Sequence, residues 1–469
     1  MEIERWGLNL GEIEDLGHRL REFWHVYGVY TQTKTRDTRE YGYHYLNGIL
    51  RIEKERTIAA ISRTEGVPYQ NMHHYISESP WSGPKVIKQA RTEIVWHPHF
   101  ETGSMLLGDE SADDRSGKVL VGVGRQYNGR QGKVDISQVG VFLSIVKDGK
   151  HNWIDGELYL PEEWFDEDHQ ELRQKTGLPE DRQFQTKLQL FWQMLQRAQA
   201  EDIPFAAVGC DGLYGRSFWL RQKMVQAGIE FYADVPANTK VYLSEPKIGI
   251  PQNKRGRKAT EQRVLSPLPH RIDDLPVHPS VLWQTLTIRP TERGWLKAGF
   301  ARIPVWTVQD DLTVTKQWLL MRKEGKKYSY TFSNASADTP LQVMALRKSQ
   351  RYFIERDNQD AKSEFGWDEI QTTSYNAWQH QLAFTVLAQW FINQTRLDWE
   401  QKHLRDPDLL AEYEVDRLPA LSVANVRELL RAALPLPILS PLEAASLVVQ
   451  HLDNRTRSRK SRVLNRSGP

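Results

Sequence analysis

The sequence has little of three features, and each shortage excludes a class of protein. It contains a single cysteine, Cys210, among 469 residues, which excludes an internal disulfide and a cysteine-rich zinc site and favours a reducing cytoplasm. No stretch approaches the roughly 18 consecutive apolar residues of a membrane span, and the start, MEIERWGLNL, lacks the basic and then apolar pattern of a signal peptide. We therefore expect no membrane role.

An excess of charge is also missing, but the charges are unevenly distributed. Lys and Arg number 62 against 60 Asp and Glu, so net charge alone does not indicate a nucleic-acid partner. Two stretches are nevertheless basic: NKRGRK at 253–258 and RTRSRKSRVLNR at 455–466. Both can neutralise DNA phosphates, and the alternative is a solvated loop and a disordered tail. The candidate contacts in them are Lys254, Arg255, Arg257, Lys258, Arg457, Arg459 and Lys460.

The first 100 residues predict helices. Within them, RTIAAISRTEGVPYQNMHHYISESPW at 56–81 indicates a short helix, a turn at Gly66 and a second helix with the polar tips Gln70, Asn71 and His73. This pattern is typical of a helix-turn-helix, whose second helix enters the major groove, although many helical hairpins share it. Because His73 and His74 are adjacent, they point to different faces and do not predict a metal site.

From residue 104 the pattern changes from helical to extended. The runs SMLLGDES, VLVGVGRQY, VDISQVGVFLSIV and WIDGELYLP predict neighbouring strands of one sheet, and the second contains Arg125, a candidate DNA contact. A helix, a strand, a helix and a strand follow up to residue 235. The Pro-rich stretch 236–344 predicts more strands, and helices return after it, including NAWQHQLAFTVLAQWFI, which is expected to be amphipathic. The expected class is α/β with a mixed sheet.

Two of the predicted strands end in an acid. Asp109 follows SMLLG, and Asp211 follows FAAVGC. Glu110, Asp113 and Asp114 lie close to the first and remain alternatives to it. A carboxylate at the carboxyl end of a buried strand lies where open α/β sheets bind ligands, so these acids are candidate site residues.

The stretch RYFIERDNQDAK at 351–362 predicts a helix with one charged stripe. At about 100° per residue, Arg351, Glu355 and Lys362 fall within roughly 40° of one another, and an apolar stripe beside them anchors the helix. The apolar residues are Ile354, Ala361 and Phe365. A simpler interpretation is a surface ion pair between Arg351 and Glu355.

Glu355 would complete a site of three carboxylates with Asp109 and Asp211. Carboxylates that stay ionised close together need a cation, and oxygen ligands without Cys or His favour Mg²⁺ or Mn²⁺. Two such ions suit phosphoryl transfer on DNA, with Arg351 and Lys362 holding the phosphates. Nearby Asp357, Asp360 and Glu364 lack the same spacing to the two cations.

The order Asp109, Asp211, Glu355 resembles that of the DDE transposases of bacterial insertion sequences. The helix is similar to the third motif of their cut-and-paste group, Tyr-x2-Arg-x3-Glu-x6-Lys, at Arg351, Glu355 and Lys362, with Lys348 in place of the tyrosine. The stretches GDES, VGVGRQYNGRQGKVDISQVGVFLS, GELYLPEEW, VGCDGLYG and QDAKSEFGWDE are similar to insertion-sequence family 701, and the likeness spans roughly residues 100–395.

This resemblance implies an RNase H-like catalytic core at 101–235 and 345–400, interrupted by a β-rich insertion domain at 236–344. Residues 1–100 would be a helical DNA-binding region, and 401–469 a helical region with a basic tail. Some relatives use a Trp of the insertion to hold a flipped base, for which Trp283, Trp295 and Trp306 are candidates; core packing is the alternative for each.

The resemblance further implies cut-and-paste transposition in the bacterial cytoplasm, at the nucleoid. The protein would bind the terminal inverted repeats in double-stranded DNA, cleave there with two Mg²⁺ or Mn²⁺ ions, and join the freed end to target DNA as a homodimer in a synaptic complex. Lys348 would then be one of the DNA contacts.

Two alternatives remain. A catalytically silent relative would bind DNA as a regulator or complex subunit, but it would be free to lose a carboxylate, and all three are present. A glycosidase would explain the 16 Trp residues but not the cations around Glu355 or the basic tail.

Overall fold

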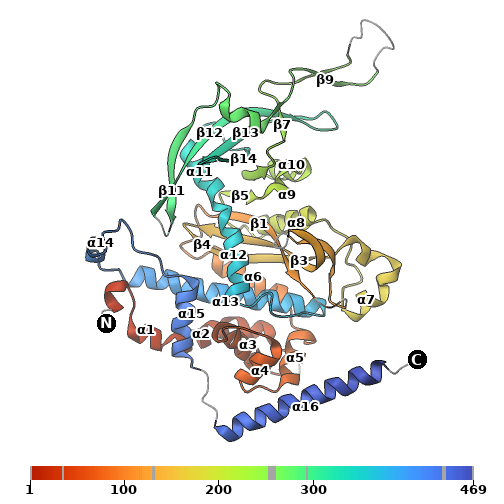
Figure 1. Cartoon of the computed structure of the whole chain (residues 1–469), viewed down its shortest axis with the longest axis vertical. Helices are drawn as coiled ribbons and strands as arrows, with labels where there is room; N and C mark the ends of the chain where they lie inside the picture. The colour runs from red at the N-terminus through yellow and green to blue at the C-terminus, as the bar shows by residue number, and fades with distance from the viewer. Residues whose placement is uncertain are drawn as a thin grey trace.

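The computed structural model describes residues 3–33, 36–115, 117, 119–128, 132–251, 260–291, 294–435 and 440–466. In Figure 1 a large mixed sheet lies above the long helix α13 (Tyr375–Lys402), and the N-terminal helices lie below it. The architecture is therefore mixed α/β, as the sequence predicted. None of the described helices combines the length and apolar character that a membrane span needs.

The N-terminal part is helical, as its pattern predicted. Its helices are α1 (Leu10–Glu14), α2 (Leu16–Gly28), α3 (Arg39–Arg51), α4 (Ile58–Thr64), α5 (Tyr69–Ser77) and α6 (Gly83–Val95), with short 3-10 turns η1 (Ile3–Trp6) and η2 (Val29–Thr31). Thr57 caps α4 and Ser82 caps α6, each accepting a backbone N–H in the first turn. Helices α4 and α5 pack against each other and against α3.

In the described part of the chain, the large sheet has ten strands. They are β1 (Met105–Asp114), β2 (Gly124–Asn128), β3 (Lys133–Lys147), β4 (Lys150–Tyr159), β5 (Ala207–Cys210), β6 (Phe231–Val235), β11 (Gln284–Thr291), β12 (Gly294–Val308), β13 (Val314–Glu324) and β14 (Lys327–Ser333). Their order is β11-β12-β13-β14-β6-β5-β1-β3-β2, and β4 also pairs with β3. Strands β1, β5 and β6 are parallel, whereas the other pairings in this sheet are antiparallel.

Strands β11–β14, from the second part of 236–344, continue the sheet of the preceding strands. Strand β14 pairs with β6 from Tyr330↔Val235 to Ser333↔Tyr232, which joins the two groups of strands edge to edge. Two small ribbons lie outside this sheet, formed by β7 (Lys240–Val241) with β10 (His270–Arg271) and by β8 (Lys247–Gly249) with β9 (Arg263–Ser266). The stretch expected to be an insertion domain is thus continuous with the main sheet.

The remaining helices connect and cover the strands. Before β11 come η3 (Glu162–Phe165), η4 (Glu167–His169), α7 (Gln170–Lys175), α8 (Lys187–Ala200), α9 (Gly212–Gly215), α10 (Phe218–Gln226) and η5 (Ile272–Val277). After β14 come α11 (Leu341–Gln350), α12 (Tyr352–Ser363), α13, α14 (Asp408–Glu412), α15 (Val423–Ala433) and α16 (Pro441–Arg466). Basic residues expected in a tail thus belong to α16, which lies apart from the main body in Figure 1.

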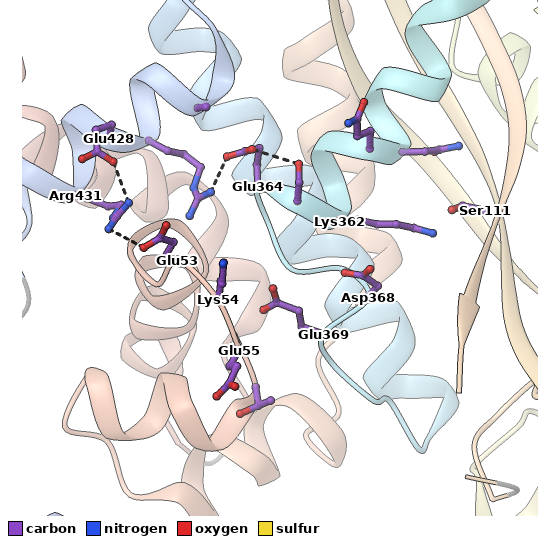
Figure 2. Close-up of a pocket in the computed structure, with 16 residues that line it drawn as sticks. Glu53, Lys54, Glu55, Ser111, Lys362, Glu364, Asp368, Glu369, Glu428 and Arg431 are labelled. Carbon is purple, nitrogen blue, oxygen red and sulfur yellow. Dashed lines mark hydrogen bonds and ion pairs between the residues drawn. The ribbon is translucent and has the colours of Figure 1, made fainter. Parts of the chain in front are cut away.

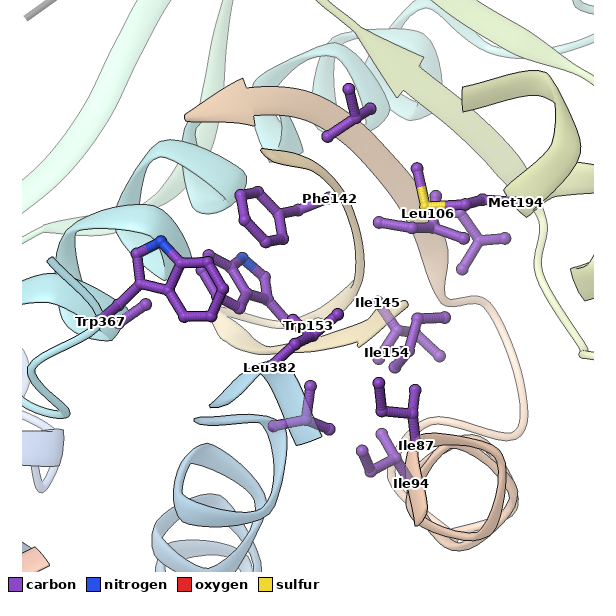
Figure 3. Close-up of a cluster of buried hydrophobic side chains, with 14 of the residues drawn as sticks. Ile87, Ile94, Leu106, Phe142, Ile145, Trp153, Ile154, Met194, Trp367 and Leu382 are labelled. Atoms are coloured by element: carbon purple, nitrogen blue, oxygen red, sulfur yellow. The ribbon is translucent and has the colours of Figure 1, made fainter. Parts of the chain in front are cut away.

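The core joins the sheet to α13. Phe142 of β3 stacks on Trp153 of β4 with ring centroids 4.0 Å apart, and Trp367 meets both rings edge-on at 5.5 Å (Figure 3). Leu382 of α13 is buried in the same cluster. Helix α13 was expected to be amphipathic, but it is buried on nearly all sides because α3, α5, α6, α15 and β4 all pack around it.

One predicted strand is shorter than expected. The run VLVGVGRQY forms a strand only from Gly124, and its first residues make a turn with Gly122 at φ +69°. Leu120, Val121 and Val123 are buried in the core without being part of a ladder. Their apolar character therefore reflects the packing of a loop, which an apolar run alone does not distinguish from a strand.

Candidate active site

Three neighbouring parallel strands bring three aspartates into one row. Gly108 of β1 lies opposite Cys210 of β5, and Cys210 lies opposite Ala233 of β6. The next residue on each strand is an acid: Asp109, Asp211 and Asp234. Parallel strands in register carry matching residues side by side, so the row forms one acidic edge where β5 ends.

The prediction that β1 ends at Asp109 is wrong. The strand continues to Asp114 because β3 pairs with it over its whole length, from Met105↔Val146 to Asp114↔Ser137. What ends near Asp109 is the pairing with β5, whose last partner is Gly108. Asp109 therefore lies within a continuous strand. It belongs to the acidic edge because the neighbouring strand, β5, ends at Cys210.

The first two acids of the row have raised pKa values. Burial raises the pKa of Asp109 well above its ordinary value, and the negative charges of Asp211 and Glu110 raise it further. Burial and then the charge of Glu110 also raise the pKa of Asp211, although its carboxylate caps α9 by accepting N–H bonds from Leu213 (2.9 Å) and Tyr214 (3.3 Å). Negative charge at this edge is thus incompletely neutralised, which favours a bound cation.

Glu355 lies in the first turn of α12 and is linked to this edge through Arg351. Its side chain is 51% exposed, and its Oε1 is 2.6 Å from a terminal nitrogen of Arg351, as the four-residue spacing predicted. Arg351 stands at the junction of α11 and α12, and its Nε lies 3.1 Å from Asp234 Oδ2. Arg351 therefore bridges the third acid of the row to Glu355.

Lys362 has a different neighbour from the one expected. Its Nζ lies 2.8 Å from Asp113 Oδ1 and donates to the carbonyl of Ala112 at 2.9 Å. Asp113 is a buried acid that also accepts a hydrogen bond from the indole of Trp367 at 2.7 Å. The lysine thus joins α12 to β1, whereas Arg351 is the cation beside Glu355.

Lys348 is not placed to contact DNA, contrary to the prediction. Its side chain is 6% exposed, and its Nζ lies 2.5 Å from Asp234 Oδ1. Burial lowers the pKa of this ammonium, and the charge of Asp234 opposes that shift. A buried cation needs a partner, so the sequence feature that explains Lys348 is Asp234, which the sequence analysis did not single out.

Neighbouring acids that were alternatives to the predicted ones have partners of their own. Glu110 lies 3.3 Å from Lys187 of α8. Asp357 lies 2.6 Å from His151, and Asp360 lies 3.1 Å from Arg356. Glu110 nevertheless adjoins the row, because its backbone N–H donates to Asp109 Oδ1 at 2.9 Å and its charge acts on Asp109 and Asp211.

The donor set partly fits a divalent cation. Among the residues described, no three His, Cys, Asp or Glu side chains are grouped closely enough to hold a metal ion. Asp109 and Asp211 are hard oxygen donors whose unneutralised charges suit Mg²⁺ or Mn²⁺. Glu355 is bound to Arg351 instead, so it would join them only after leaving that ion pair.

A cavity of about 1160 Å³ lies elsewhere, at the other end of α12 (Figure 2). It is lined by the loop before α4, the second half of α12 with the loop after it, α15 and Ser111 of β1, and none of Asp109, Asp211 and Glu355 borders it. Some of its charges pair with one another, as between Arg427 and Glu364 at 2.7 Å and between Arg431 and Glu428 at 2.9 Å. The cavity therefore reaches β1 at Ser111 but includes none of the three predicted carboxylates.

The predicted DNA contacts of the N-terminal region lie on α5. Gln70 and Asn71 are exposed and His73 is half-buried, and Asn71 donates a hydrogen bond to the Tyr41 hydroxyl at 3.1 Å. The turn between α4 and α5 contains Gly66 at φ +68°, as a tight helical hairpin requires. These side chains are accessible, and their contact with DNA stays a prediction.

The other predicted contacts are scattered. Arg125 is exposed on β2, and the basic residues Arg457, Arg459 and Lys460 are exposed on α16, where Arg457 lies 2.8 Å from Asp453. The basic loop residues lie outside the described residues: Lys254, Arg255, Arg257 and Lys258.

The three tryptophans proposed for base stacking differ in exposure. Trp295 is 48% exposed at the start of β12. Trp283 is partly buried and donates its indole N–H to the Pro276 carbonyl at 3.0 Å, and Trp306 has the ammonium of Lys316 5.1 Å from its ring centroid. Of these three, Trp295 has the most open ring.

Comparison with known proteins identifies the family of this chain. Residues 28–294, more than half of the chain, match the family model described as DDE superfamily endonuclease. A stretch of 165 residues is 28% identical to a probable transposase for insertion sequence element IS701 from Microchaete diplosiphon, covering 35% of this chain and 40% of that protein. The chain thus aligns with about two fifths of the length of this relative, and the matched family region includes the row of aspartates but ends before Glu355.

Proposed function

This chain belongs to the DDE superfamily endonucleases, and from that membership we propose that it is a DNA transposase. It would bind the terminal inverted repeats of its own element, cut the DNA there and transfer the ends to a target site. The observation that carries the proposal is the placement of Asp109 and Asp211 side by side, with the Arg351–Glu355 pair reaching the same row through Asp234.

The strand order supports an RNase H-like core for this activity. Strands β4, β3, β1, β5 and β6 lie side by side in that order, with β1, β5 and β6 parallel and the first two pairings antiparallel. Helix α12 then brings Glu355 to the same sheet from a distant part of the sequence. Residues 236–344 would be the insertion that braces the DNA end, as part of the extended sheet.

The chain's own residues have separate roles in the proposed cleavage. Asp109 and Asp211 would hold Mg²⁺ or Mn²⁺, with Glu355 completing the site after it separates from Arg351. Two bound ions would supply activation of the attacking oxygen and stabilisation of the leaving oxygen in an in-line displacement. The backbone N–H groups of Leu213 and Tyr214 fix the Asp211 carboxylate, and Arg351 would hold a phosphate oxygen with its planar guanidinium.

The rest of the chain would recognise and hold DNA. The exposed face of α5 would read the repeat in the major groove, and the basic residues of α16 would add affinity that falls with salt. Trp295 would stack on an unpaired base, since its ring is the most open of the three candidates. Two copies of the chain would act together in a synaptic complex that pairs the two ends.

The proposal is tested with a labelled duplex that carries the element's terminal repeat. Wild-type protein with Mg²⁺ or Mn²⁺ should cut at the repeat boundary, whereas Glu355→Gln should bind the duplex with similar affinity and cut at least about 100-fold more slowly. The side chain of Glu355 is exposed, so this variant should fold normally. Binding without cleavage by the wild type, in both metals and with both ends supplied, would instead favour a silent DNA-binding relative.

A further inference from the structure

Asp234 belongs to the acidic edge but differs from its neighbours in how it is neutralised. Its Oδ1 lies 2.5 Å from Lys348 Nζ and accepts a hydrogen bond from the Thr331 hydroxyl at 2.6 Å, while its Oδ2 lies 3.1 Å from Arg351 Nε. An ionised carboxylate has about four acceptor positions, so most are occupied. Asp234 is thus poorly suited to bind a metal ion alongside Asp109 and Asp211.

The same contacts place Asp234 between Arg351 and the buried side of the site. Thr331 lies directly opposite Asp234 in the β14–β6 ladder, and Lys348 is almost fully buried on α11. A strand and a helix thus hold the same carboxylate oxygen, through Thr331 and Lys348. It binds Arg351 through Nε, which leaves the outer part of the guanidinium turned toward Glu355 and solvent.

We infer that Asp234 is a positioning residue, which holds Arg351 in place for a DNA phosphate when Glu355 leaves it. This inference rests on the proposed function and deepens it. Without the bond to Asp234, the flexible arginine would have Asp109 and Asp211 as competing partners and would neutralise the carboxylates that a cation needs. With that bond, the guanidinium offers its outer N–H groups to a phosphate oxygen in a fixed orientation.

The alternative is a purely structural role for the Asp234–Lys348 pair, and a matched pair of variants separates the two. Asp234→Asn removes the anchor of Arg351. Glu230→Gln removes a comparable ion pair between the residue preceding β6 and Arg347 of α11, at the other end of the same strand. A structural role predicts similar defects in the two variants, whereas a positioning role predicts a defect in phosphate recognition only for Asp234→Asn.

The first readout is binding without divalent metal. Fluorescence anisotropy would compare the repeat duplex with one whose boundary phosphate is replaced by an uncharged methylphosphonate. Wild type and Glu230→Gln should prefer the charged duplex, whereas Arg351→Ala and Asp234→Asn should both lose that preference. Asp234→Asn with a wild-type preference would overturn the inference.

The second readout is cleavage, where Asp234→Asn should slow the reaction about 10- to 100-fold and Asp234→Glu should restore part of the rate. Equal rates for Asp234→Asn and wild type would also overturn the inference. If Asp234→Asn does not fold because Lys348 is left unpaired, the double variant Asp234→Asn/Lys348→Met removes that buried charge and takes its place in both assays. A wild type that shows the phosphate preference but never cuts would refute the proposed function while leaving the role of Asp234 supported.

Discussion

The close approach of α9 to β6 makes Gly215 a sensitive point of the site. A Cβ at this position would lie 1.9 Å from the backbone oxygen of Asp234 and 2.9 Å from its carbonyl carbon. Because such contacts essentially never fall below 3.0 Å, Gly215→Ala must separate the two elements by about 1 Å. The expected cost is about 1 to 3 kcal/mol in the free energy of unfolding, at the upper end because the clash is with backbone.

The same shift should impair function more than stability, since it separates the turn that holds Asp211 from the strand that holds Asp234. A misplacement of about 1 Å can lower the cleavage rate about 100-fold. Gly212→Ala is the matched control in the same turn, because its Cβ would meet its nearest atom, the same carbonyl oxygen, at an ordinary 3.9 Å. Urea unfolding and cleavage of the repeat duplex would measure both effects. Indistinguishable results for Gly215→Ala and wild type would refute the described packing.

Three further predictions concern charge and exposure. Asp109→Asn should stabilise the metal-free protein at neutral pH. The pKa of Asp109 is raised in the folded state, so the folded protein holds this proton more tightly than the unfolded chain does. The wild type therefore loses stability as the pH rises from the unfolded-state pKa to the folded-state pKa of Asp109, whereas the amide variant does not. Thermal unfolding in EDTA should show this gain near pH 7 and its disappearance in acid; a gain independent of pH would contradict the cause given. Lys362→Met should lower the free energy of unfolding by about 3 kcal/mol because it leaves Asp113, with a 3% exposed side chain, without its closest cation, and adding Asp113→Asn should recover much of the loss in urea unfolding. Trp295→Ala should change stability by less than about 0.5 kcal/mol but weaken binding to a duplex with an unpaired terminal base by about 1 to 3 kcal/mol, and unchanged affinity would assign the exposed ring no stacking role.

Local patterns predicted the parts of the fold that depend on neighbours in the sequence. The four-residue spacing of Arg351 and Glu355 gave a real ion pair, and Ile354, Ala361 and Phe365 are all buried as the apolar stripe required. The strands of 282–334 were also expected, because β-branched and aromatic residues alternate there between turn residues. Helical and extended periods are properties of single segments, so they can be recognised without knowing the fold.

The partners of the site residues depended on contacts that no local pattern contains. Lys348 and Asp234 are 114 residues apart, and Lys362 meets Ala112 across 250 residues. The sequence could show that a lysine occupies the position where the motif has tyrosine, but not that an aspartate on β6 neutralises it. The predicted end of β1 was wrong because it also depends on a distant contact. The last residues of β1 form a strand only because β3 pairs with them. Register across the parallel strands was the missing signal that would have placed Asp234 beside Asp211.

The pairing of β14 with β6 has a practical consequence for shortened versions of the protein. Removing residues 236–344 would do more than delete a DNA-facing appendage, because it would uncover the backbone N–H and C=O groups along one side of β6. An exposed strand edge of this kind is a template for association with other chains, so we expect the shortened protein to aggregate. A version that keeps β11–β14 and loses only β7–β10 would leave the strands of the large sheet paired, and it is the better starting point for asking what the two small ribbons contribute.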